Sequence, residues 1–160
     1  MLRNATPDDA ASICAIYNHY VLNTPVTFEE TAVTADEMRS RILKVTEALP
    51  WLVCEEDGEL IGYSYATRWR DRAAYRHSVE LTVYLRPSSI GSGKGSELFA
   101  ALLPELRRRG IHCAIAGALL PNPRSTALLE KFGMQQVAHL REVGFKFGRW
   151  LDVGYWQLLL

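Results

Sequence analysis

Apolar side chains in the first 50 residues recur with the period of an α-helix. Five of them lie three or four positions apart or side by side on one face: Ile13, Ile16, Tyr17, Tyr20 and Val21. The preceding stretch TPDD suits a helix start, because Thr6 can cap, Pro7 fits the first turn and two aspartates favour its positive end. Thr34 and Glu37 match a capping box. The pattern therefore predicts two helices before residue 50.

Beyond residue 50 the period changes to that of strands. Residues 51–56 and 60–66 are strongly apolar, and Asp57–Gly58 between them favours a tight hairpin turn. Residues 77–85 alternate. One face of this predicted strand carries Val79, Leu81, Val83 and Leu85, and the other carries Ser78, Glu80, Thr82 and Tyr84.

The second half of the chain mixes both periods. Leucines and Phe99 between residues 98 and 106 indicate a helix that Pro104 should kink or shift in register. Residues 112–119 predict a buried strand, residues 123–133 a short helix, and residues 135–147 and 153–160 two further strands. Interleaved helices and strands indicate one α/β domain over residues 1–160, with a mixed sheet and helices on both faces.

Composition narrows the class of protein. The chain of 160 residues is 48% hydrophobic, as in a globular domain, and 18 basic residues balance 18 acidic ones. This balance leaves no positive field for nucleic acid. No apolar run approaches the roughly 20 residues of a membrane span, and the N-terminal stretch lacks a signal-peptide pattern. We therefore expect a cytoplasmic protein with neither a nucleic acid nor a membrane as partner.

Cysteine and histidine give no metal pattern. Cys14, Cys54 and Cys113 lack ligand spacing, and the four histidines do not cluster. We expect no metal and a reducing compartment.

The stretch IGSGKGSELF holds three glycines at alternate positions, Gly91, Gly93 and Gly95, before a predicted helix. Backbone N–H groups at such a place can bind phosphate. A P-loop would need glycine at Ser88 and Ser or Thr at Gly95, and the Rossmann pattern needs another glycine spacing. Taken alone, the loop is either a different phosphate site or a flexible turn.

The surroundings of the loop resemble a known family. VYLRPSSIGSGKGSELFAALLPELRRRG is similar to the acetyl-CoA signature of the GNAT acetyltransferases, and AIYNHYVLNTPVTFEE, AYRHSVELTVY and VGFKFGRWLDVGYWQ resemble their phosphinothricin N-acetyltransferase branch. The likeness runs from Arg3 to Leu159. It implies a GNAT fold, with a central, mixed, mostly antiparallel twisted sheet of about seven strands flanked by about four helices. It also implies acetyl-CoA as cosubstrate and a homodimer.

The resemblance assigns residues to the cofactor. Amides of Val83 and Leu85 would polarise the thioester carbonyl, and Asn122 and Ser125 would lie along the pantetheine arm. The pyrophosphate would lie among Ile90, Gly91, Ser92, Gly93, Lys94, Gly95 and Ser96. Where many members carry Arg or Gln, this chain has Ile90, Ser92 and Ser96, so Lys94 becomes the candidate substitute charge.

Acetyl transfer to an amine needs a proton acceptor and an exit for the thiolate. Glu80 fits the base, on the predicted strand before the glycine loop, although a solvated glutamate on a sheet face is the alternative. Many members carry a tyrosine or histidine as acid where this chain has Leu129, which leaves Tyr84 and water as candidates.

The stretch RWRDRAAYR offers arginine forks for a carboxylate or phosphinate, unless it is merely a solvated basic loop. The resemblance places the substrate against Phe28, Arg70, Arg72, Tyr75, Thr82, Lys146 and Val153, with Lys146 in a loop that caps the pocket. We interpret Trp69, Trp150 and Trp156 as packing residues.

These observations predict an N-acetyltransferase whose partner is a small-molecule amine such as phosphinothricin, methionine sulfoximine or methionine sulfone. Two alternatives remain open. One is a degenerate family member that binds acetyl-CoA with little turnover, and the other is a protein or peptide N-acetyltransferase.

Overall fold

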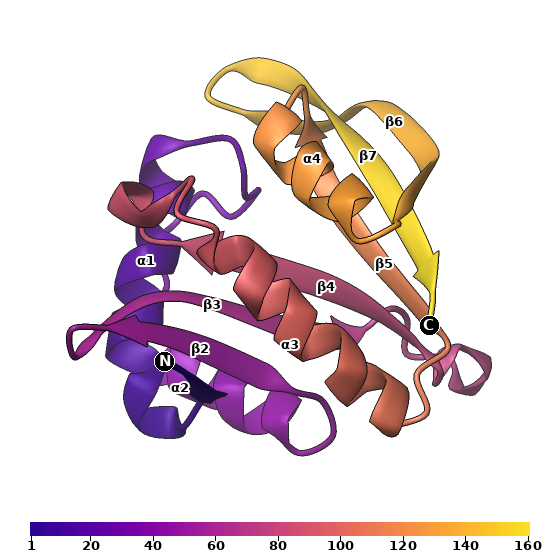
Figure 1. Cartoon of the computed structure of the whole chain (residues 1–160). Coiled ribbons are helices and arrows are strands. Elements are labelled where there is room, and N and C mark those ends of the chain that lie inside the picture. Colours follow the sequence, from indigo (N-terminus) through magenta and orange to yellow (C-terminus); the bar gives the residue numbers. More distant parts are fainter.

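Seven strands form one sheet in the spatial order β1-β2-β3-β4-β5-β7-β6 (Figure 1). A computed structural model describes all residues, 1–160. The strands are β1 (Leu2–Asn4), β2 (Trp51–Glu56), β3 (Glu59–Arg68), β4 (Ser78–Leu85), β5 (Cys113–Leu120), β6 (Gln135–Lys146) and β7 (Arg149–Leu159). The α-helices are α1 (Ala10–Asn23), α2 (Ala35–Thr46), α3 (Lys94–Arg108) and α4 (Pro123–Lys131). The GNAT-type sheet and helix numbers expected from the sequence are confirmed.

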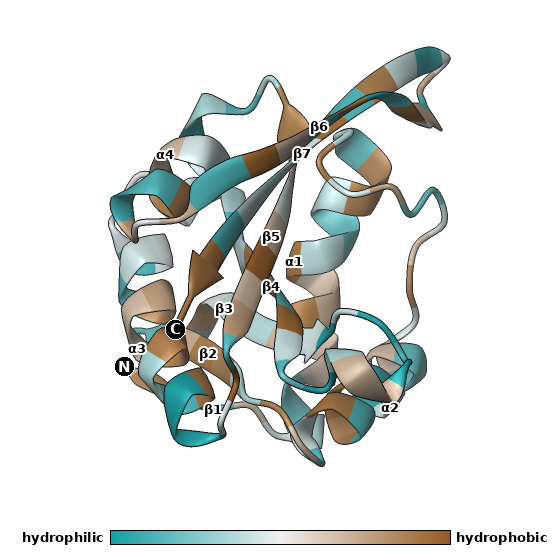
Figure 2. Ribbon diagram, turned by 90° about the vertical axis from the view of Figure 1, so that its right-hand side faces the viewer, coloured by the Kyte–Doolittle hydropathy of each residue, from teal (hydrophilic) through white to brown (hydrophobic).

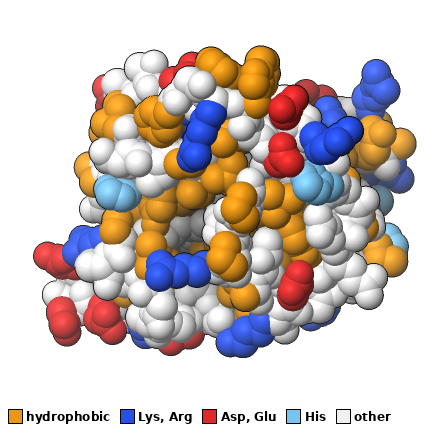
Figure 3. Space-filling view, turned by 90° about the horizontal axis from the view of Figure 1, so that it is seen from above, with side chains coloured by type: hydrophobic (Ala, Val, Ile, Leu, Met, Phe, Trp, Pro, Cys, Tyr) orange, Lys and Arg blue, Asp and Glu red, His pale blue; other side chains and the backbone are white.

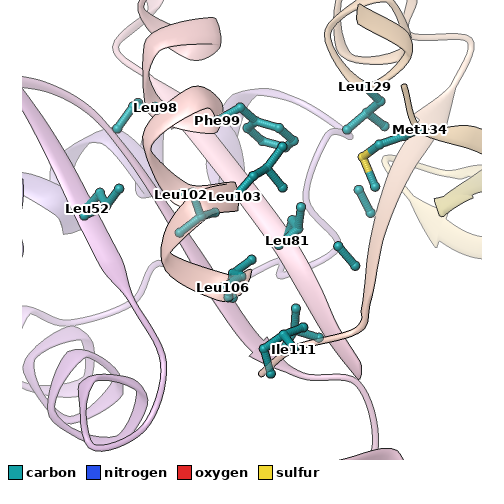
Figure 4. Close-up of a cluster of buried hydrophobic side chains, with 14 of the residues drawn as sticks. Leu52, Leu81, Leu98, Phe99, Leu102, Leu103, Leu106, Ile111, Leu129 and Met134 are labelled. Carbon is teal, nitrogen blue, oxygen red and sulfur yellow. The ribbon is translucent and has the colours of Figure 1, made fainter. Parts of the chain in front are cut away.

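The helices cover both faces of the sheet, as predicted. Helices α1 and α2 bury Ile13, Val21 and Ile42 against Val53 and Tyr63 of β2 and β3. On the other face, α3 and α4 cover a second core. Figure 4 shows leucines of α3 and Phe99 directed at Leu52 and Leu81 of the sheet, with Leu129 and Met134 beside them. This double packing makes the sheet a rigid support for residues at its edges and gaps.

The sheet opens between its two middle strands. Strand β4 pairs with β5 in parallel only from Ser78 to Glu80, opposite Cys113 to Ile115, whereas every other neighbouring pair is antiparallel. The last five residues of both strands lie beyond this short ladder, and Figure 1 shows the two strands diverging from the end near the C-terminus. The divergence exposes backbone groups of β4 in the middle of the sheet.

Local signals in the sequence produced the expected elements. The Thr34 hydroxyl accepts the Glu37 N–H at 3.1 Å and starts α2. Asp57 and Gly58 have φ of 52° and 80°, so both central residues of the β2–β3 turn are left-handed, as a type I′ hairpin requires.

Three details differ from the prediction. Pro7–Asp9 forms a 3-10 turn, and α1 itself begins at Ala10. The apolar face of α3 runs through Pro104 without a register shift, because Leu102, Leu103 and Leu106 stay buried on both sides of it and this burial outweighs the lost hydrogen bond. Strand β1 was not predicted, since three residues are too few to show a period. None of the helices has both the length and the hydropathy that a bilayer crossing requires.

Candidate active site

The gap between β4 and β5 continues into a cavity of about 390 Å³, which we call the cleft. Its walls come from β4, β5, β6, β7, α4, Phe99 of α3 and the segment after α1. Figure 3 looks down on this end of the molecule and shows a hollow among hydrophobic side chains. Eight of the residues predicted for the site line it: Phe28, Glu80, Thr82, Val83, Tyr84, Asn122, Ser125 and Val153. A mostly apolar concave site with a few polar groups is the usual form of a ligand pocket.

Backbone N–H groups of β4 point into the cleft. The Ser78 carbonyl accepts from Trp69 N–H on the β3 side, and the Arg86 N–H donates to the Ile61 carbonyl on the same side. Because backbone groups alternate along a strand, the odd-numbered residues between them turn their N–H groups toward β5. Beyond the short β4–β5 ladder, Val83 and Leu85 have no strand opposite them. These two amides are thus free to donate to a carbonyl oxygen held in the cleft.

The Glu80 carboxylate lies at the point where β4 and β5 separate. A Cβ atom placed on Gly117 of β5 would lie 3.5 Å from Glu80 Oε1 and 3.1 Å from Cε1 of Tyr155. Both side chains therefore lie against Gly117, and the Tyr155 ring is closer than most side chains at this position would allow. Burial raises the pKa of Glu80, and the nearby charge of Arg70 partly opposes this effect. A carboxyl group with a raised pKa in a cleft is suited to accept a proton near neutral pH.

Tyr155 is a cleft residue that sequence reasoning missed. Its ring meets Trp69 edge-on at 5.5 Å, and the Arg70 guanidinium lies 5.0 Å from the centroid of the Trp69 ring. Burial raises the pKa of Tyr155, and the Glu80 charge adds to this effect. The available signal was alternation along β7, which puts Tyr155 on the same face as Val153. Trp69 packs on Tyr155, in agreement with its interpretation as a packing residue.

Tyr84 belongs to a cluster of tyrosines at the base of the cleft. Its ring centroid lies 5.3, 5.1 and 5.7 Å from those of Tyr17, Tyr20 and Tyr63. Burial among these rings raises the pKa of Tyr84 far above its usual range. The hydroxyl therefore keeps its proton and is a weaker acid than an exposed phenol. This environment favours hydrogen-bond donation by Tyr84 and leaves water as the other source of a proton.

The glycine loop lies outside the cleft lining, at the N-terminus of α3. Gly91 and Gly93 have φ of 87° and 86°, and a Cβ at either position would meet no atom within 4 Å. Their backbone is thus left-handed and faces open space, which suits a phosphate that approaches the helix N-terminus. Gly95 differs from both, because it is buried in the first turn of α3 and a Cβ there would make an ordinary contact of 3.5 Å with Leu128 of α4.

Two lysines lie beside this loop, the predicted Lys94 and one that was not predicted. The ammonium group of Lys94 binds Glu97 at 3.1 and 3.2 Å, so its charge is shared with a carboxylate. Lys131 of α4 was not predicted and donates to Ser96 Oγ at 3.0 Å. No local sequence signal could have found Lys131, since it is 35 positions from Ser96. Lys131 is a second basic group available beside the loop.

Asn122 connects the cleft to α4. Its side-chain oxygen accepts the Ser125 N–H at 3.3 Å and so caps the helix, while both residues line the cleft. The amide nitrogen of Asn122 remains available to a ligand.

Only some of the predicted substrate residues lie in or near the cleft. Phe28, Thr82 and Val153 line the cleft, and Arg70 lies near enough to influence Glu80. Arg72 and Tyr75 are exposed in the segment before β4 and do not line the cleft.

The expected place of Lys146 was wrong. It is the last residue of β6, not part of a loop, and only 2% of it is exposed. Its ammonium group donates to the carbonyls of Val21, Thr24 and Thr27 at 2.7, 2.9 and 2.8 Å. Strand alternation turns the side chain inward, so it supports the wall of the cleft instead of covering its mouth. The described residues contain no cluster of His, Cys, Asp or Glu that could hold a metal ion.

Comparisons with known proteins agree on one family. Residues 2–154 match the family described as Acetyltransferase (GNAT) domain. The chain is 42% identical over 153 residues to phosphinothricin N-acetyltransferase of Alcaligenes faecalis, covering 94% of this chain and 78% of that protein. It is 38% identical over 161 residues to the L-methionine sulfoximine/L-methionine sulfone acetyltransferase of Salmonella typhimurium, with 99% and 94% coverage.

Solved structures give the same result. A putative acetyltransferase from Salmonella typhimurium with its cofactor acetyl-CoA superposes with a TM-score of 0.97 at 37% identity, over 100% of this chain and 93% of the other. A ribosomal-protein-alanine N-acetyltransferase from Brucella melitensis is equally similar, with a TM-score of 0.97, 37% identity and coverage of 100% and 99%.

Proposed function

This chain belongs to the GNAT acetyltransferase family and is an acetyltransferase, and on that premise we propose that it transfers the acetyl group of acetyl-CoA to the primary amine of a small amino-acid-like molecule. Phosphinothricin, methionine sulfoximine and methionine sulfone are the proposed type of acceptor. The observation that carries the proposal is the half-buried carboxyl group of Glu80 in the same cleft as the unpaired amides of β4.

The donor side uses backbone groups. Acetyl-CoA supplies a thioester with an electrophilic acetyl carbon. The loop at Gly91 and Gly93 binds its pyrophosphate through N–H groups, with Lys131 nearby as a cation. Asn122 holds the pantetheine arm. The amides of Val83 and Leu85 stabilise the negative charge that develops on the carbonyl oxygen during attack.

The acceptor side uses Glu80 as general base. Glu80 takes a proton from the substrate amine, directly or through water, and the amine nitrogen then bonds to the acetyl carbon while the carbon–sulfur bond breaks. The sulfur leaves as a thiolate, and the second proton that the amine nitrogen must lose passes to it through Tyr84 or water, which gives the free thiol. The raised pKa of Glu80 brings it closer to the working pH than an exposed glutamate, which favours proton transfer.

The amine pocket is the part of the cleft lined by Phe28, Thr82 and Val153. Its apolar walls suit the side chain of a small amino acid. The guanidinium of Arg70 lies beside it and attracts a carboxylate or an oxyanion. Arg72 and Tyr75 stay predicted contacts from the neighbouring exposed segment.

One panel of acceptors tests this function. Purified protein is incubated with acetyl-CoA and phosphinothricin, methionine sulfoximine, methionine sulfone, ordinary amino acids or a peptide that begins with alanine, and free thiol is measured. Turnover of small acceptors supports the proposal. Turnover of the peptide alone contradicts it and favours a protein N-acetyltransferase, the alternative that the Brucella structure makes specific. Coenzyme A binding without turnover of any acceptor indicates a degenerate member.

Replacement of Arg70 should change the pH dependence of acetyl transfer. Burial raises the pKa of Glu80 and the Arg70 cation lowers it, so Arg70→Met removes the opposing effect and raises this pKa further. Glu80 must be ionised to act as base, and the acidic limb of kcat/KM should therefore move to higher pH. Arg76→Met is the matched control, because Arg76 is exposed in the same segment and binds only the Ala73 carbonyl. Coincident pH profiles for the two variants would contradict the role of Arg70.

We also propose that the protein is a homodimer. Strand β6 is an edge of the sheet, and the β6–β7 end carries exposed Phe145, Phe147 and Trp150. Figure 2 shows this end projecting beyond the body of the molecule. Large exposed apolar side chains grouped in this way are typical of interfaces. Light scattering after gel filtration should give twice the chain mass of 18.0 kDa for the wild type. Trp150→Glu should lower the measured mass toward that of the monomer, and a monomeric wild type would refute the dimer.

The proposed compartment is the cytoplasm. Cys14, Cys54 and Cys113 are all free and buried, which suits a reducing environment. Cell fractionation with an antibody to the protein would decide the point, and recovery outside the cytoplasmic fraction would contradict it.

A further inference from the structure

The ammonium group of Lys146 is buried without a carboxylate partner. Its three acceptors are main-chain carbonyls at the end of α1 and in the segment that follows it, Val21, Thr24 and Thr27. Val21 is among the last four residues of α1, whose carbonyls lack partners inside the helix. A cation at this end also interacts favourably with the helix dipole. Lys146 thus joins the far end of β6 to the C-terminus of α1.

The end of β6 makes a second contact with the segment that follows α1. A Cβ placed on Gly144 would lie only 2.3 to 2.9 Å from three ring atoms of Phe28, so the Phe28 ring packs directly on the backbone of Gly144. The Tyr17 hydroxyl adds a hydrogen bond of 2.9 Å to Thr27 Oγ1. We call residues 24–28 the pocket loop. It is held by an ammonium group, an aromatic contact and a hydroxyl.

The pocket loop forms one wall of the cleft. Val26, Thr27 and Phe28 all line it, together with Asn122 and Ser125 of α4. Residues 24–34 contain no helix or strand, so no ladder of backbone hydrogen bonds keeps this wall in shape. Three carbonyls that converge on one ammonium group supply the missing constraint. Strand β6, on which the loop packs through Phe28, contributes Leu140 and Val143 to the same cavity.

We propose that Lys146 and Gly144 are positioning residues that hold the pocket loop in place and thereby set the specificity for the amine acceptor. This inference rests on the proposed function. Lys146 does not contact the substrate, because its three donors are already used by carbonyls. Burial of an ammonium group that has no paired carboxylate costs free energy. Burial accordingly lowers the pKa of Lys146, and the charge of Glu30 opposes this effect only in part, so an apolar residue would give a more stable protein. What the lysine adds is one fixed arrangement of three carbonyls.

Lys146→Met tests the proposal, since methionine keeps an unbranched apolar stem and removes all three donors. We expect KM for the best amine acceptor to rise about 10- to 100-fold, the range for a pocket wall displaced by about 1 Å, while KM for acetyl-CoA stays within twofold. Hydrogen exchange of the backbone amides in residues 24–28 should become faster. Lys44→Met is the control, because Lys44 is exposed on α2, and it should change none of these quantities.

Gly144→Ala provides an independent test if Lys146→Met does not fold. The added methyl group displaces the Phe28 ring and leaves the ammonium group untouched, so KM for the amine should rise and KM for acetyl-CoA should not. An unchanged amine KM with unchanged exchange of residues 24–28 in a folded variant overturns the proposal, as does an equal rise in both KM values. If the wild type acetylates none of the amines, the proposed function fails, and the exchange of residues 24–28 alone decides the positioning role.

Discussion

Glu80→Gln should lower kcat for acetyl transfer about 10²- to 10⁴-fold, the usual contribution of a positioned general base. Glutamine keeps the shape of the side chain beside Gly117 but cannot accept the amine proton. Activity that remains should increase with pH, because more of the substrate amine is then neutral without assistance. Initial rates of thiol release at several pH values measure both effects. Acetyl-CoA KM should change little, since the glycine loop and the amides of β4 are intact.

Two controls separate chemistry from folding. Burial raises the pKa of Glu80, which means that the charged form is destabilised in the folded protein at neutral pH. A neutral glutamine removes that cost, so the thermal unfolding midpoint should be equal to or above that of the wild type. Glu47→Gln, at an exposed glutamate of α2's C-terminal end, should leave kcat unchanged. A Glu80→Gln protein with wild-type kcat at neutral pH would show that Glu80 is a bystander and that positioning and amide polarisation suffice.

Gly93→Val should raise KM for acetyl-CoA about 5- to 30-fold. Gly93 has φ of 86°, and a left-handed conformation costs an L-residue roughly 1–2 kcal/mol, so valine drives the loop away from the shape that presents its N–H groups. A branched side chain also occupies the open space from which the pyrophosphate would approach. Isothermal titration gives the dissociation constant of coenzyme A, and steady-state kinetics give KM for acetyl-CoA. KM for the amine should be unaffected.

Gly110 offers a matched control for backbone strain. It has φ of 74° and open space at its Cβ position, but it follows the C-terminus of α3, at the opposite end of the helix from the glycine loop. Gly110→Val should therefore lower the unfolding temperature by about as much as Gly93→Val does, and it should leave the affinity for coenzyme A unchanged. Equal loss of coenzyme A binding in both variants, or none in a folded Gly93→Val protein, would mean that the loop does not hold the pyrophosphate.

Much of the fold follows from interactions between residues close in sequence. Thr34 caps α2, Asp57 and Gly58 form the predicted hairpin turn, and alternation in β4 puts Glu80 and Tyr84 on one face. Each of these depends on hydrogen bonding or steric preference within a few residues, so the local sequence is sufficient. Periodicity does not predict functional roles. The roles expected of the glycine loop and of Glu80 came from the resemblance to a family.

The arrangement of the cleft was decided by contacts between distant segments. The Lys146 ammonium binds the Val21 carbonyl across 125 positions, Lys131 binds Ser96 across 35, and Glu80 and Tyr155 both lie against Gly117 of β5. Alternation tells which face of a strand a residue occupies, but not which strand lies beside it or where two strands separate. The sequence by itself therefore determined the helices, every strand except β1, the hairpin turn and the candidate base. Only the tertiary structure decided that β4 parts from β5 after Glu80, and that Lys146 supports the wall of the pocket, because pairing and burial depend on the packing of the whole chain.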